Sequence, residues 1–133
     1  MAEKLIRIGR VSSINYETGM IKILYPDLDD SVTDDLPYIS LNGEYKMPSI
    51  GQNVLVLHLS NGTAAGVIMG PFWNEGDPPP EGGADLFRKD ISKTPGESYV
   101  RYEDGTLKIK APTLVFETDN GTISMDSILA KLG

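Results

Sequence analysis

The chain has 133 residues, of which 12 are basic and 19 acidic, so its formal net charge is −7. This length suits one domain, or one small domain with an appendage. The negative net charge has the wrong sign for a protein that neutralises nucleic-acid phosphates, and it argues against adhesion to anionic lipid. The chain has no cysteine, which excludes disulfides and thiolate metal sites.

The first 73 residues alternate apolar and polar positions in short segments, and Gly9 inside the first of them predicts a bend or bulge. The chain's 14 glycines and 9 prolines favour strands and turns over long helices. Turn dipeptides such as Asn42-Gly43 and Asn61-Gly62 separate the segments. We expect strands near 5–14, 20–25, 36–41, 54–59 and 64–69. Five short antiparallel strands are typical of a small Greek-key barrel, so residues 1–73 are predicted to form an OB-fold domain.

Three features of this barrel are weighed for function. His58 lies mid-strand without a second histidine or a cysteine, which favours a structural role over a ligand or a base. The acidic segment 27–35 matches no EF-hand loop, which favours a solvated loop over a calcium site. Phe72 and Trp73 end the barrel; they either contact an assembly hub or, more simply, plug the barrel end.

A proline- and glycine-rich segment at 74–85 predicts an exposed linker. Beyond it, residues 86–133 form the predicted stem. From Tyr99 to Met125 the stem alternates like β-strands, with turns at Asp104-Gly105 and Asn120-Gly121. Asp126 is expected to cap a short terminal helical turn.

The stem has an apolar face that so short a sequence cannot cover by itself, and two or three strands alone are marginal in water. Another copy of the same chain is the simplest cover, so we expect an obligate oligomer. Packing on the barrel within one chain is the alternative. The predicted shared core consists of Leu107, Ile109, Leu114, Phe116, Ile123 and Met125.

The order of these segments resembles a known family. A short barrel opens with Ile8-Gly9-Arg10-Val11, and the strands Val54-Leu55-Val56-Leu57 and Gly66-Val67-Ile68-Met69-Gly70 follow. After the linker comes Tyr102-Glu103-Asp104-Gly105-Thr106-Leu107. This layout is similar to the baseplate spike proteins of contractile phage tails, called baseplate assembly protein V, and to the related spikes of R-type bacteriocins and type VI secretion.

The resemblance implies a homotrimer with three barrels and an intertwined β-helical or prism-like stem. Such a spike sits on the baseplate axis beneath the tail tube, contacts hub and tube proteins, and is driven into the host envelope when the sheath contracts. Its action is mechanical, with no catalytic residue and no cofactor. We therefore expect it in the baseplate of a phage virion or bacteriocin particle.

One departure concerns the apex. Many members end in a His-X-His motif through which three chains hold one iron ion, whereas the single histidine here is His58. The resemblance therefore implies no metal site, and either a plain apex or a separate tip protein. The short stem favours a Gram-positive host or a capped assembly.

Two other functions are kept open. An OB barrel binds saccharides or single-stranded nucleic acid in some proteins, but the barrel here carries five basic against eight acidic residues, which disfavours nucleic acid. An enzyme is disfavoured because the chain holds no Gly-X-Ser-X-Gly, Walker or His-Glu-X-X-His motif.

The expected localisation follows from two further features of the sequence. Met1–Lys4 leads into a strand rather than a signal peptide, and no apolar run approaches the roughly 20 residues of a membrane span. We therefore expect a soluble protein made in the host cytoplasm.

Overall fold

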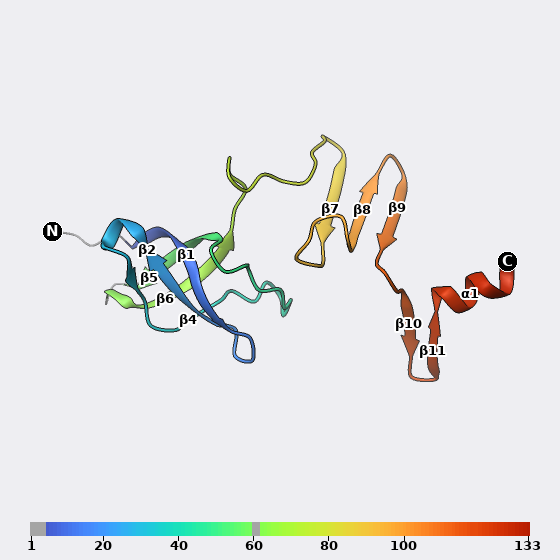
Figure 1. Cartoon of the computed structure of the whole chain (residues 1–133), viewed down its shortest axis with the longest axis horizontal. Coiled ribbons are helices and arrows are strands. Elements are labelled where there is room, and N and C mark those ends of the chain that lie inside the picture. Colours follow the sequence, from blue (N-terminus) through green and yellow to red (C-terminus); the bar gives the residue numbers. More distant parts are fainter. Residues whose placement is uncertain (1–4, 60–61) are drawn as a thin grey trace. The chain divides into compact units, whose positions relative to one another are not determined.

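The structure, a computed structural model, describes residues 5–59 and 62–133 (Figure 1). The chain divides into two compact units, Met1–Pro78 and Pro79–Gly133. Strands dominate both, and the described residues contain a single short α-helix, so the predicted all-β class is confirmed. The boundary between the units falls inside the segment predicted as a linker, and Asn61 of the predicted Asn61-Gly62 turn lies outside the described residues.

The N-terminal unit is built on one twisted sheet in the order β3-β2-β1-β5-β6, with β4 also paired to β2 (Figure 1). All of these pairings are antiparallel. A 3-10 turn, η1 (Pro26–Leu28), follows β2. The strands are β1 (Ile6–Asn15), β2 (Met20–Tyr25), β3 (Ser31–Val32), β4 (Leu36–Pro37), β5 (Asn53–Leu59) and β6 (Gly62–Pro71).

The segment around β4 connects β2 with β6, the last strand of this order. β4 pairs with β2, and the next residue, Tyr38, forms a parallel bridge with Ile68 of β6. The Ile39 backbone N–H donates a hydrogen bond to the Ile68 carbonyl at 3.0 Å. The pairings therefore run in a circuit from β1 through β2, β4, Tyr38, β6 and β5 back to β1.

The sequence-based strand at 36–41 was predicted too long. Only Leu36–Pro37 pairs as a strand, and Leu41 and Asn42 take positive φ angles of 41° and 62°, which a strand does not allow. The predicted acidic loop at 27–35 instead contributes the short strand β3. Both differences arise where turn residues, rather than the apolar pattern, fix the backbone.

The core lies inside this unit and follows the two-residue period of the strands. Strand β2 buries Ile21, Ile23 and Tyr25, and β5 buries Val54 and Val56. Each buried core side chain is at most 2% exposed. Among the residues whose burial the structure describes, the core consists of Val11, Ile21, Ile23, Tyr25, Leu36, Val54, Val56 and Ile68.

Gly9 occupies an inward-facing position of β1 where no side chain fits. A Cβ placed there would lie 2.4 Å from Ile23 Cγ2 and 2.7 Å from Tyr25 Cε1, both fully buried. The packing of Tyr25 thus explains a glycine in the middle of a strand, where glycine otherwise costs stability.

Gly9→Ala should destabilise the N-terminal unit by about 1–3 kcal/mol, because the added methyl group overpacks a core that has no room to move. At this domain size, each kcal/mol lowers the melting temperature by roughly 4–8 °C. Thermal unfolding followed by circular dichroism measures the shift. Gly76→Ala is the control, since a Cβ there meets its nearest atom at 3.5 Å; equal shifts for both variants would contradict the prediction.

The C-terminal unit consists of a three-stranded antiparallel sheet, a hairpin and a helix (Figure 1). The predicted Asp104-Gly105 turn joins β8 and β9, with positive φ at both residues, as a type I′ hairpin turn requires. The elements are β7 (Leu86–Asp90), β8 (Tyr99–Glu103), β9 (Thr106–Lys110), β10 (Val115–Thr118), β11 (Gly121–Ser124) and α1 (Met125–Leu132).

The terminal helix begins two residues earlier than the predicted cap requires, so the prediction of Asp126 as N-cap is wrong. Ser124 is the N-cap, and its hydroxyl accepts a hydrogen bond from the Ser127 backbone N–H at 3.2 Å. Asp126 lies in the first turn and Lys131 in the last, where each charge complements the helix dipole.

Candidate assembly interface

One face of the β7–β9 sheet is largely apolar. Directly opposite residues of antiparallel strands share a face. The register pairs Phe87 with Tyr102 and Tyr102 with Leu107. The adjacent row pairs Val100 with Ile109 on one side and with Lys89, the one charged residue of these two rows, on the other. Leu107 is 62% exposed, and burying such an apolar side chain against another protein surface would be favourable. This surface, called the apolar sheet face below, consists of Phe87, Val100, Tyr102, Leu107 and Ile109.

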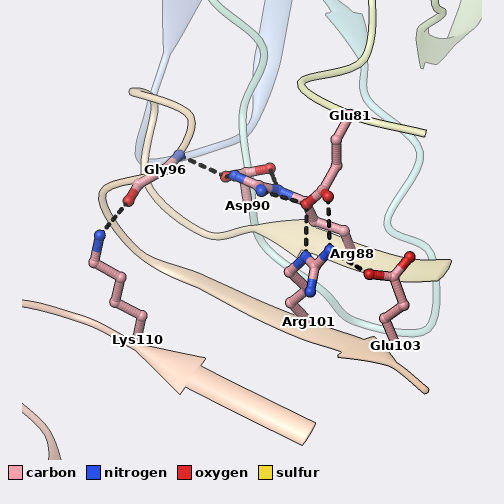
Figure 2. A network of polar contacts seen from close by, with 7 residues as sticks. All are labelled: Glu81, Arg88, Asp90, Gly96, Arg101, Glu103 and Lys110. Atoms are coloured by element: carbon pink, nitrogen blue, oxygen red, sulfur yellow. Dashed lines mark hydrogen bonds and ion pairs between the residues drawn. The ribbon is translucent and has the colours of Figure 1, made fainter. Parts of the chain in front are cut away.

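The opposite face of the same sheet is charged and carries a dense polar network (Figure 2). Arg88 and Arg101 lie directly opposite each other on β7 and β8. Glu81, from the segment before β7, accepts hydrogen bonds from both: Oε2 lies 2.6 Å from Arg88 Nη1 and 2.7 Å from Arg101 Nε, and Oε1 lies 2.8 Å from Arg101 Nη2. One carboxylate therefore joins two guanidinium groups that would otherwise repel each other.

Further carboxylates complete the network. Asp90 accepts from Arg88 Nε at 2.9 Å and Nη2 at 3.0 Å, a bidentate pair, and Glu103 accepts from Arg101 Nη2 at 2.8 Å. The Gly96 N–H donates to Asp90 Oδ1 at 2.9 Å, which ties the β7–β8 loop to the sheet. Both arginines are mostly buried by these contacts, so the charged face is already occupied by groups of the same unit.

The two arginines lower the pKa of Glu81 to about 2, chiefly through the hydrogen bonds from Arg101 and Arg88. In turn, hydrogen bonds to Asp90 and Glu81 raise the pKa of Arg88, and those to Glu81 and Glu103 raise the pKa of Arg101. The network thus favours the charged forms of Glu81, Arg88 and Arg101.

Because folding depresses the pKa of Glu81 below its ordinary 4.5, the stability that this group contributes is fully present above pH 4.5 and is lost as the pH falls towards 2. We expect the Glu81 side-chain carboxyl to titrate with a midpoint well below 4.5 in a carbon-detected NMR titration. A Glu81 midpoint near 4.5 would contradict the network. Arg101→Gln should move the Glu81 midpoint upwards, because it removes the largest cause of the depression.

The β10–β11 hairpin carries a second apolar row. Phe116 and Ile123 lie opposite each other, and Phe116 is 51% exposed. Leu114 and Met125 extend the row, since the Met125 N–H donates to the Leu114 carbonyl at 2.8 Å, and both are half-buried. Helix α1 adds the exposed Leu129 and Leu132 at the end of the chain.

The six residues predicted as a shared stem core are therefore all surface or half-buried positions of a single chain. Among the described residues, the C-terminal unit contains no buried apolar side chain. Phe87, Val100 and Tyr102 were missed by the prediction. The alternation of β8 could have indicated Val100 and Tyr102. In β7, however, Leu86 and Phe87 are consecutive apolar residues, so the pattern does not show which of them lies on the apolar face.

A further apolar surface lies on the N-terminal unit. Ile6 of β1 lies opposite Leu57 of β5, and Ile8 lies on the same outward face. All three, together with Leu59, are exposed, while the side chains on the reverse side of these strands pack in the core.

Phe72 and Trp73 follow directly after β6. Trp73 is 65% exposed, so it does not plug the end of the sheet, whereas Phe72 is half-buried.

His58 is a buried strand residue with two partners. Its Nδ1 lies 3.2 Å from the Ala65 carbonyl, to which it donates, so Nε2 accepts from the Tyr25 hydroxyl at 2.5 Å. Burial of Tyr25 raises its pKa to about 12. This arrangement completes the core and leaves neither imidazole nitrogen directed at a ligand.

The acidic segment is distributed among separate contacts. Asp27 pairs with Arg7 at 3.7 Å and Asp35 with Lys22 at 3.8 Å. Within residues 5–59 and 62–133, no three His, Asp or Glu side chains are arranged to hold a metal ion. Over the same residues, no helix has the length and apolar character needed to cross a membrane.

Comparison with known proteins gives no family assignment: no family model matches the chain, and no curated protein matches it.

Proposed function

We propose that the chain is the structural central spike of a contractile phage-tail or bacteriocin baseplate, and that it acts as a homotrimer. The observation that carries this proposal is the apolar sheet face of the C-terminal unit, which no other part of that unit covers. The hairpin row of Leu114, Phe116, Ile123 and Met125 repeats the same feature. In the proposed trimer both surfaces face the corresponding strands of two other copies, which also removes free strand edges.

The N-terminal unit is proposed to be an OB-type barrel. The strand circuit supports this, because a five-stranded, partly open Greek-key barrel requires the segment at β4 to contact both β2 and β6. The outward row of Ile6, Ile8, Leu57 and Leu59 and the exposed Trp73 are proposed contacts for the baseplate hub.

The proposed action is mechanical. Contraction of the sheath would push the trimer into the host envelope, with a separate tip protein or the chain's own end at the apex. Each aliphatic side chain buried in a shared core contributes roughly 1.5–3 kcal/mol, and three copies contribute together. Such a core resists force without any bond being made or broken.

The experiment is a solution mass determined by size exclusion with light scattering. We expect three times the chain mass of 14.5 kDa. A stable monomer would refute the spike and favour the alternative function, an OB module that binds a saccharide or single-stranded nucleic acid. That alternative would then be tested by titration with oligosaccharides and with oligonucleotides at two salt concentrations.

A further inference from the structure

The segment between the two units is fixed at both of its ends, each within its own unit. Its first part, Asn74–Asp77, is a tight turn in which the Asn74 N–H donates to the Asp77 carbonyl at 3.2 Å and the Asp77 N–H donates back at 3.1 Å. The Asn74 side chain stiffens the turn by donating to the Phe72 carbonyl at 3.1 Å and accepting from the Gly76 N–H at 2.9 Å.

This turn is held on the N-terminal unit by Gln52. Its Nε2 donates to Asp77 Oδ2 at 2.9 Å. The backbone of Gln52 is itself fixed, because its carbonyl accepts from the Val11 N–H at 3.0 Å, and Val11 is a core residue. Asp77 is therefore tied through one side chain to the centre of that unit.

The far end is tied in the same way to the C-terminal unit. Glu81 accepts three hydrogen bonds, at 2.6–2.8 Å, from Arg88 and Arg101 (Figure 2). These bonds are charge-assisted, and their donors project from neighbouring strands of one sheet. Glu81, close to the start of this unit, is thus fixed before β7 starts.

Between Asp77 and Glu81 the sequence contains only Pro78, Pro79 and Pro80. Each proline ring fixes φ near −65°, and a proline that follows another residue restricts that residue to extended backbone. Consecutive prolines adopt the polyproline II helix, which rises about 3.1 Å per residue and behaves as a semi-rigid spacer.

We infer that the connection between the units is a stiff spacer of three prolines, with Asp77 and Glu81 as its two anchors, rather than a flexible linker of about twelve residues. The spacer is about 9 Å long at the polyproline II rise. The inference goes beyond the proposed function and does not depend on it, since both anchors lie within single units and exist in a monomer as in a trimer.

Backbone ¹⁵N relaxation of the deuterated full-length protein tests this inference. We expect order parameters near 0.85 for the Asp77 and Glu81 amides, the value of rigid backbone, rather than below about 0.6. Glu81→Gln should lower the order parameters of Glu81 and Gly82 towards the flexible range and leave Asp77 unchanged. Gln52→Ala should do the reverse, so each variant controls for the other.

Glu97→Gln is a matched control, because it removes a carboxylate from an exposed loop of the same unit. Amide shifts of β7–β9 that match the unmodified protein establish that Glu81→Gln still folds. Flexible amides at both anchors of the unmodified protein would overturn the inference, and so would order parameters that neither variant changes. The solution mass of the same sample reports separately on the proposed trimer.

Discussion

Leu107→Asp should dissociate the proposed trimer. Leu107 lies on the edge strand β9 of the apolar sheet face, opposite Tyr102 of the central strand, and it is 62% exposed in the single chain. In a trimer, three copies of the side chain leave the shared core together. At roughly 1.5–3 kcal/mol each, the loss is about 4.5–9 kcal/mol per trimer, which weakens association a thousandfold or more. Burying the aspartate charge adds a further penalty.

Thr106→Asp is the matched control, because Thr106 is the preceding residue of β9 and lies on the charged face. Light scattering at micromolar concentration should report one chain mass of 14.5 kDa for Leu107→Asp and three times that mass for the control. Circular dichroism should show that the N-terminal unit of Leu107→Asp is still folded. A Leu107→Asp protein that keeps the trimer mass, or a control that dissociates, would place the interface elsewhere.

Deletion of residues 86–133 should leave a folded, monomeric N-terminal unit. The buried apolar core residues of the described part of the chain lie between Val11 and Ile68, so the deletion removes none of them. It removes the apolar sheet face, the hairpin row and helix α1, which are the surfaces proposed to hold the copies together. The expected result is cooperative thermal unfolding together with the mass of a single shortened chain.

Two different results would contradict this prediction, and they have different meanings. A folded product that remains trimeric would show that the outward row of Ile6, Ile8, Leu57 and Leu59 joins the copies, instead of contacting a hub. An unfolded product would show that the N-terminal unit depends on the strands after Leu86. In the first case, Ile8→Asp should make the shortened chain monomeric, since it disrupts the outward row without entering the core.

The sequence predicted the elements that depend on local chemistry. The two-residue alternation indicated β1, β2, β5 and β9, and the Asp104-Gly105 dipeptide indicated a hairpin turn, because positive φ angles at such a turn are accessible to few residue types. Where two local signals competed, the sequence misled. Ser124 and Asp126 are both good cap residues, and only the end of β11 decided that Ser124 caps the helix.

The same alternation located the apolar rows of the stem but not the charged network behind them. Nothing in the spacing of Glu81, Arg88 and Arg101 predicts that one carboxylate bridges two strands, because the pairing depends on the register of β7 against β8. The proline-rich segment indicated a linker, and the side chains of Gln52 and Glu81 that fix its ends were not distinguishable from other polar residues.

The sequence by itself thus determined the all-β class, the position of most strands and the alternation of their faces, since these follow from backbone sterics and local side-chain pattern. Only the tertiary structure decided that position 9 has room for glycine alone and that His58 is buried in a hydrogen bond with Tyr25. It also decided which face of the β7–β9 sheet no other part of the unit covers. These properties depend on residues far apart in the chain, and their contacts exist only once strand register and packing are fixed.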